Sequence, residues 1–204
     1  MAMDQNIDLV KRGYNQIAKT YSQHRVSLHA EKYLYQLLKM LKKQATILDL
    51  GCGNGLPVDS ILIKNDFLLF GIDISPVQIA MAQKNLPQGS FVVKNMLDLK
   101  DGEYQVDAVV SFYALFHIPK VRHLEMLKKI NSFLPNKGWL LITMGDRDFE
   151  GEHQLLGTKM WSSQFGVEKN RQLIKQAGFE IILDKIDHSG KERHQIIIAQ
   201  KSGI

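Results

Sequence analysis

Three glycines in one short loop are the residues with the clearest chemical meaning in this sequence of 204 residues. Gly51, Gly53 and Gly55 follow the apolar run Ala45–Leu50 and precede a stretch with helical periodicity. Because glycine has no Cβ, such a loop can turn sharply and bring backbone N–H groups close to a ligand. The spacing G-x-G-x-G differs from the dinucleotide fingerprint and from the P-loop. For this loop alone, a tight turn without a ligand is the alternative.

Ligand-type side chains also follow the next three apolar runs. Asp73 stands 18 residues after Gly55, and a carboxylate there can accept both hydrogen bonds of a ribose diol. Asn95 and Met96 combine an amide and a thioether, which suit the edge and the face of an adenine ring. The run Ser-Phe-Tyr at 111–113 comes after the fourth apolar run. Four such ends together favour a nucleoside site over four unrelated turns.

The elements that must position these residues alternate between strand and helix. Short apolar runs predict buried strands, and three- and four-residue spacing of apolar residues predicts helices between them. This alternation implies βαβ units and a mainly parallel sheet. The predicted strands span 45–50, 67–72, 90–93, 105–111 and 138–144, and the predicted helices span 57–64, 76–84 and 121–133.

The C-terminal part has a different pattern. Residues 145–157 are polar and predict a long loop. A helix is expected over 169–177, stopped by Gly178. Two strands, 179–188 and 194–200, then flank a turn at Gly190, which indicates an antiparallel hairpin at the end of the sheet.

Three segments that carry these residues resemble the class I S-adenosylmethionine-dependent methyltransferases: Ile47–Gly55, Gly71–Ser75 and Val106–His117. The likeness covers at least residues 45–200, and its motifs are specific for the cofactor but not for the methyl acceptor. It implies an α/β, Rossmann-like fold. The expected seven-stranded, mostly parallel sheet has an antiparallel C-terminal hairpin and helices on both faces.

The resemblance also implies which residues hold S-adenosylmethionine. The glycine loop passes the methionyl part and is supported by Asp49, while Asp73 holds the ribose hydroxyls. The family usually has Asp where this sequence has Asn95; the amide oxygen can still accept a hydrogen bond from the adenine amine. The predicted cofactor residues are Asp49, Gly51, Cys52, Gly53, Gly55, Asp73, Ile74, Asn95, Met96, Ser111, Phe112 and Tyr21.

His117 is the candidate catalytic residue. A methyl group on a sulfonium is already activated, so the protein has to align the nucleophile and, for a protonated acceptor, remove a proton. His117 follows the fourth predicted strand, and histidine titrates near neutral pH. A packing role for His117 is the alternative. The candidate acceptor residues are Tyr14, Tyr113, His153, Met160 and Trp161, and no cluster of metal ligands is found, so no metal is predicted.

The net charge of +5 is confined to the N-terminal segment. Residues 1–44 hold eight basic and three acidic residues, so residues 45–204 are balanced. Helical periodicity runs over 7–41 with a break near 22–27. We therefore expect one domain, with 1–44 as a helical lid segment and 45–204 as the cofactor-binding methyltransferase domain. The surplus charge favours an anionic acceptor or marks a solvated helix face.

The predicted function is methyl transfer to an O, N or C nucleophile of a small molecule. An RNA or protein methyltransferase, a non-catalytic S-adenosylmethionine-binding protein and a nicotinamide dehydrogenase are the alternatives. The glycine spacing argues against the last of these. The Asn/Asp-Pro-Pro-aromatic motif of amino-directed nucleic-acid methyltransferases is absent. The sequence also has no stripe of basic and aromatic residues of the kind that binds nucleic acid.

Composition sets further bounds. A single cysteine, Cys52, excludes an internal disulfide framework and a cysteine-based zinc site. No apolar run reaches the ~20 residues that cross a bilayer, and the first residues have no apolar signal core, so a cytoplasmic location is expected. The oligomeric state cannot be read from the sequence.

Overall fold

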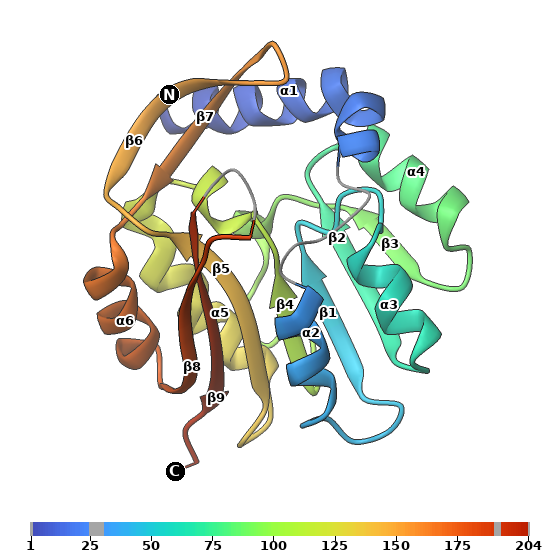
Figure 1. The fold of residues 1–204 in the computed structure, drawn as a ribbon, viewed down its shortest axis with the longest axis vertical. Coiled ribbons are helices and arrows are strands. Elements are labelled where there is room, and N and C mark those ends of the chain that lie inside the picture. The colour runs from blue at the N-terminus through green and yellow to red at the C-terminus, as the bar shows by residue number, and fades with distance from the viewer. Residues whose placement is uncertain (1, 25–30, 190–192, 204) are drawn as a thin grey trace.

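The computed structural model describes residues 2–24, 31–189 and 193–203. Its centre is a seven-stranded sheet in the order β3-β2-β1-β4-β5-β9-β8 (Figure 1). The first five strands are parallel, and β9 lies antiparallel between β5 and β8. The predicted sheet and its antiparallel end are confirmed, although Gly190 lies outside the described residues. The strands are β1 (Thr46–Leu50), β2 (Leu68–Asp73), β3 (Ser90–Val93), β4 (Ala108–Ser111), β5 (Trp139–Gly145), β8 (Phe179–Asp187) and β9 (His194–Lys201).

The middle strands are mostly apolar, as expected for strands that helices cover on both faces. Leu48 on β1, Val109 on β4 and Leu141 on β5 are fully buried. One apolar cluster packs the sheet against α5 and α6, and a second packs it against α2, α3 and α4. These helices are α2 (Glu31–Leu38), α3 (Val58–Lys64), α4 (Pro76–Asn85), α5 (His123–Phe133) and α6 (Val167–Gln176).

The first helix, α1 (Ala2–His24), lies across the carboxyl ends of the parallel strands (Figure 1). It packs on α4 at one end of this edge and on β7 at the other. Residues 22–24 of the predicted break at 22–27 are helical and end α1, and residues 25–27 lie outside the described residues. Among the described residues of the segment 1–44, α1 covers this edge, whereas Leu34 and Leu37 of α2 are buried in the core. In the described part of the chain, no helix is long and apolar enough to cross a membrane.

The prediction of a long loop at 145–157 is wrong. This region contains β6 (Phe149–Leu155), which pairs antiparallel with β7 (Thr158–Gln164). Leu156 and Gly157 form the two-residue turn, and both have positive φ, at 50° and 77°. Such turns favour Asn or Asp before glycine, so leucine gives no turn signal. The side chains of β6 are exposed or half-buried, so the sequence of this strand is polar like that of a loop.

Candidate functional site

The glycine loop after β1 has a backbone that other residues would strain. Gly51, Gly53 and Gly55 have φ values of 84°, 57° and 79°, in the left-handed region that favours glycine. A Cβ on Gly51 would lie 2.3 Å from the Cβ of Ala114. The N–H groups at 51 and 52 both donate to the carbonyl oxygen of Ile72, at 2.8 and 3.0 Å. The loop is therefore held tightly against the end of β2.

Asp73 ties this loop to β2 through its side chain. Its Oδ2 accepts a hydrogen bond from the backbone N–H of Gly53 at 2.9 Å, and its Oδ1 accepts one from Ser75 at 2.8 Å. Desolvation raises the pKa of Asp73 to about 6, and these two backbone donors act in the opposite direction. The carboxylate is thus oriented by fixed dipoles at the end of the strand.

Two buried acids lie behind the loop. Asp49 and Asp59 have 2% and 0% of their surface exposed. Burial raises the pKa of both carboxyls, and the charge of Asp49 raises the pKa of Asp59 further, so burial favours the protonated form of each. Asp59 was not predicted from the sequence. An acid among the apolar residues that begin α3 was the available signal.

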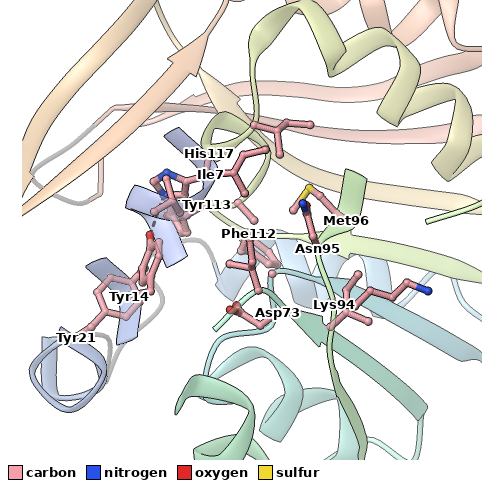
Figure 2. A pocket seen from close by; sticks show the side chains of 16 residues that line it. Ile7, Tyr14, Tyr21, Asp73, Lys94, Asn95, Met96, Phe112, Tyr113 and His117 are labelled. Carbon is pink, nitrogen blue, oxygen red and sulfur yellow. Dashed lines mark hydrogen bonds between the residues drawn. The ribbon is translucent and has the colours of Figure 1, made fainter. Parts of the chain in front are cut away.

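A pocket opens between α1 and the strand ends (Figure 2). Tyr14 and Tyr21 reach into it from α1, and Asp73 stands at its floor. Asn95 and Lys94 lie on the far side from the two tyrosines. Lys94 is paired with Glu103 outside the pocket. The pocket is enclosed by α1 on one side and by the ends of β1 to β4 on the other.

Seven of the twelve predicted cofactor residues line this pocket. The other five belong to the same strand ends but do not line it. The Ser111 hydroxyl donates to the carbonyl oxygen of Leu50 at 2.9 Å, and burial raises the pKa of the Cys52 thiol. The seven are Gly51, Asp73, Ile74, Asn95, Met96, Phe112 and Tyr21, and the five are Asp49, Cys52, Gly53, Gly55 and Ser111.

The side chain of Asn95 has a structural task besides lining the pocket. Its Oδ1 accepts from the backbone N–H of Leu97 at 3.0 Å and caps the short helix η1 (Met96–Asp98). One lone pair of the oxygen is therefore used. Any adenine contact has to use its other lone pair or the Nδ2 donor.

A family model matches the central part of the chain. Residues 47–138 match the model described as "Methyltransferase domain", and this stretch holds the glycine loop, Asp73 and Asn95. Over this stretch the chain is similar to the S-adenosylmethionine-dependent methyltransferases.

Solved methyltransferases share the fold across nearly the whole chain. Magnesium protoporphyrin IX methyltransferase from Synechocystis PCC 6803, with bound S-adenosylmethionine, has a TM-score of 0.75 at 16% identity and covers 97% of both chains. The 1,6-didemethyltoxoflavin-N1-methyltransferase of Burkholderia thailandensis has a TM-score of 0.73 at 18% identity, over 94% of this chain and 85% of that one. At these identities the likeness supports the fold alone.

Curated relatives are more similar in sequence. Trans-aconitate 2-methyltransferase from Shigella flexneri is 27% identical over 165 residues, which is 74% of this chain and 64% of the relative. Carboxy-S-adenosyl-L-methionine synthase from Campylobacter hominis is 25% identical over 72% of this chain and 74% of the relative. The matched region thus spans less than two thirds of this trans-aconitate relative.

His117 contacts two other parts of the site. It belongs to η2 (Leu115–His117) and lines the pocket. Its Nε2 lies 2.8 Å from the hydroxyl of Tyr14, and its Nδ1 lies 2.9 Å from the carbonyl oxygen of Trp161. The ring thereby joins α1, the end of β4 and β7.

The predicted acceptor residues divide into two groups. Tyr14 and Tyr113 line the pocket. Met160 and Trp161 do not line it, because they are buried under α1 with 0% and 4% exposed surface. His153 lines a separate hollow that the β6–β7 hairpin forms with Phe116 and His194.

Sequence reasoning also missed part of the wall. The apolar residues Ile7 and Val10 of α1 and Ala114 and Ile118 after β4 complete the pocket. A helical stripe on α1 was the available signal for the first two. Within the described residues, no group of three or more histidine, cysteine or acidic side chains is placed to bind a metal.

Proposed function

We propose that this chain binds S-adenosylmethionine in the pocket and transfers its methyl group to a small molecule by in-line displacement. The observation that carries this proposal is the convergence of four strand ends on one cavity: the glycine loop, Asp73, Asn95 and Phe112. In open α/β sheets, ligands bind outside the carboxyl ends of the strands.

The residues of the pocket fit this cofactor. When bound, S-adenosylmethionine supplies a methyl group on a positively charged sulfonium, which is an activated electrophile. Asp73 is an oriented acceptor suited to two ribose hydroxyls, and Ile74 and Met96 offer apolar surface for the adenine ring.

The enclosure of the pocket supports a small acceptor. Tyr14 and Tyr21 of α1 stand over it, and β7 packs on the same helix. An RNA or protein chain would have to displace α1 to reach Asp73. The names of the relatives agree with this, because trans-aconitate and 1,6-didemethyltoxoflavin are small molecules.

His117 is the residue that we propose as proton acceptor during transfer. It lines the pocket on the side of α1 and β7, away from Asn95 and Lys94. A base positioned at the reacting group typically contributes about 10²–10⁴-fold in rate. His123, the next histidine, is buried, and desolvation lowers its pKa to about 4, which makes it unsuitable as a base near neutral pH.

Calorimetry and label transfer test the proposal. The wild-type protein should bind S-adenosylmethionine and its demethylated product, and Asp73→Asn should bind both much more weakly. Transfer of a tritiated methyl group to fractionated metabolites then separates an enzyme from a non-catalytic binding protein. Absence of calorimetric binding in a folded wild-type protein would contradict the proposal at its first step.

A further inference from the structure

The side chains of Tyr14 and His117 are joined by a hydrogen bond at the wall of the pocket. Tyr14 comes from α1 and His117 from η2, and the tyrosine oxygen lies 2.8 Å from Nε2. Both residues line the pocket (Figure 2). The covering helix is therefore connected to a titratable group at the end of β4, and the direction of this hydrogen bond determines its chemistry.

The second ring nitrogen of His117 sets that direction. Its Nδ1 lies 2.9 Å from the backbone carbonyl oxygen of Trp161. A carbonyl oxygen only accepts, so Nδ1 carries a proton. In the neutral imidazole, Nε2 then has the lone pair and accepts from the hydroxyl of Tyr14. The phenolic proton of Tyr14 points to His117, so its oxygen can accept a hydrogen bond from another donor in the pocket.

We propose that Tyr14 and His117 form a proton relay, and that the methyl acceptor is therefore an O–H or N–H compound, such as a phenol, an enol or a heteroaromatic N–H, rather than a carboxylate. This proposal rests on the proposed methyl transfer. A carboxylate is already ionised near neutral pH and has no proton to deliver. An acceptor that starts protonated needs a base, and Tyr14 is the catalytic group that would touch it.

The transfer balances in atoms and electrons. The acceptor oxygen or nitrogen forms a bond to the methyl carbon, and the bond from this carbon to sulfur breaks with its electron pair remaining on sulfur. The proton of the acceptor passes to the oxygen of Tyr14, while the proton of Tyr14 passes to Nε2 of His117. The imidazolium keeps its Nδ1 hydrogen bond to the carbonyl of Trp161 and loses its extra proton to water after product release.

Several other groups surround this pair and bear on its titration. The ring of Tyr21 lies edge-on to Tyr14 with centroids 5.3 Å apart. Phe116 lies 4.9 Å from the ring of His117 and stacks on His194 at 5.6 Å. The remaining titratable groups of the pocket wall are Asp73, Lys94 and Tyr113. Tyr14→Phe removes one hydroxyl and leaves all of these groups in place. It therefore distinguishes the effect of the Tyr14–His117 hydrogen bond from the effects of the neighbouring groups.

Nitrogen NMR of ¹⁵N-histidine-labelled protein without cofactor tests the relay geometry. The proposal predicts the Nδ1–H tautomer for His117. It also predicts a shift of the Nε2 resonance in Tyr14→Phe but not in Tyr35→Phe, since Tyr35 is an exposed tyrosine on α2. An Nε2–H tautomer of His117, or an Nε2 resonance that is unchanged in Tyr14→Phe, would overturn the relay.

Label transfer to matched probes tests the acceptor class. We expect transfer to 4-nitrophenol or benzimidazole and none to 4-nitrobenzoate. In Tyr14→Phe we expect kcat to fall about 100-fold and the acid limb of the pH profile to shift, with the Kd of S-adenosylmethionine within about three-fold. Preference for 4-nitrobenzoate, or an unchanged kcat in Tyr14→Phe, contradicts the proposal. If the proposed function is wrong, the protein will not bind the cofactor. The tautomer of His117 is measured without cofactor, so this test of the relay is independent of that outcome.

Discussion

The carboxylate of Asp73 accepts a hydrogen bond from the backbone N–H of Gly53 at 2.9 Å. This contact joins the end of β2 to the loop after β1, so the group that would hold the ribose also holds the loop. The position of one wall of the pocket therefore depends on the ionisation of its floor.

Asp73→Asn tests this double role. The substitution removes the charge that strengthens both the loop contact and the predicted ribose contact. Hydrogen bonds to charged groups contribute about 1.5–3 kcal/mol, so we expect Kd for S-adenosylmethionine to rise about 10- to 100-fold. Calorimetry measures it, and the exposed Asp101→Asn serves as the matched control. If the two variants bind S-adenosylmethionine with equal affinity, Asp73 does not contact the cofactor.

Asp59→Asn should raise stability, and more so at high pH. The native protein holds a proton on the Asp49 and Asp59 pair in a pH range where the unfolded chain has lost it. The contribution of the pair to the free energy of unfolding therefore falls as pH rises through that range. Removing one acid relieves this loss by ~1 kcal/mol, which corresponds to about 2–4 °C in Tm for a chain of this size.

Thermal unfolding at pH 5 and pH 8 measures this effect. The Tm of Asp59→Asn should exceed that of the wild type at pH 8, and the difference should shrink at pH 5. His123 titrates in both proteins and cancels in the comparison. A Tm difference that grows toward pH 5 would mean that the pair is ionised in the native state and stabilised in another way.

Asn95→Asp should tighten cofactor binding. The amide oxygen already accepts from Leu97, whereas a carboxylate offers a second oxygen to the exocyclic amine of adenine. A charge-assisted hydrogen bond is about twice as strong as a neutral one, so we expect a Kd lower by up to about 10-fold. Calorimetry with S-adenosylmethionine measures it, with the exposed Asn136→Asp as control. Weaker binding in Asn95→Asp alone would show that the Nδ2 donor makes the contact.

Gly13→Val tests the packing of α1 on β7. A Cβ at this position would lie 2.4 Å from the sulfur of Met160 and 3.3 Å from the carbonyl oxygen of Lys159. Overpacking costs about 1–3 kcal/mol, more than the gain of well under 1 kcal/mol from replacing glycine by valine in a helix. We expect α1 to shift and Tyr14 to lose its bond to His117. Faster cofactor dissociation in stopped flow should follow, and Gln16→Val on the exposed face of α1 should dissociate at the wild-type rate.

The order of strands and helices was predictable because each element carries its own periodicity. Continuous apolar runs such as Ala108–Val110 predict strands buried on both faces. The spacing of Gly51, Gly53 and Gly55 with Asp73 predicted the cofactor side of the site, because parallel strands end at one edge. The β6–β7 hairpin was missed since its turn uses Leu156 at positive φ and its first strand faces solvent.

What the sequence determined by itself was therefore the resemblance to methyltransferases, the sheet and the residues along its carboxyl edge, since these depend on local patterns. The tertiary structure alone decided the pairing of Tyr14 with His117, 103 residues apart. It also placed Asp49 next to Asp59, and it buried Met160 and Trp161 away from the pocket. Such contacts depend on how α1 and the hairpin pack over the sheet, and packing between distant segments leaves no spacing in the chain from which it can be predicted.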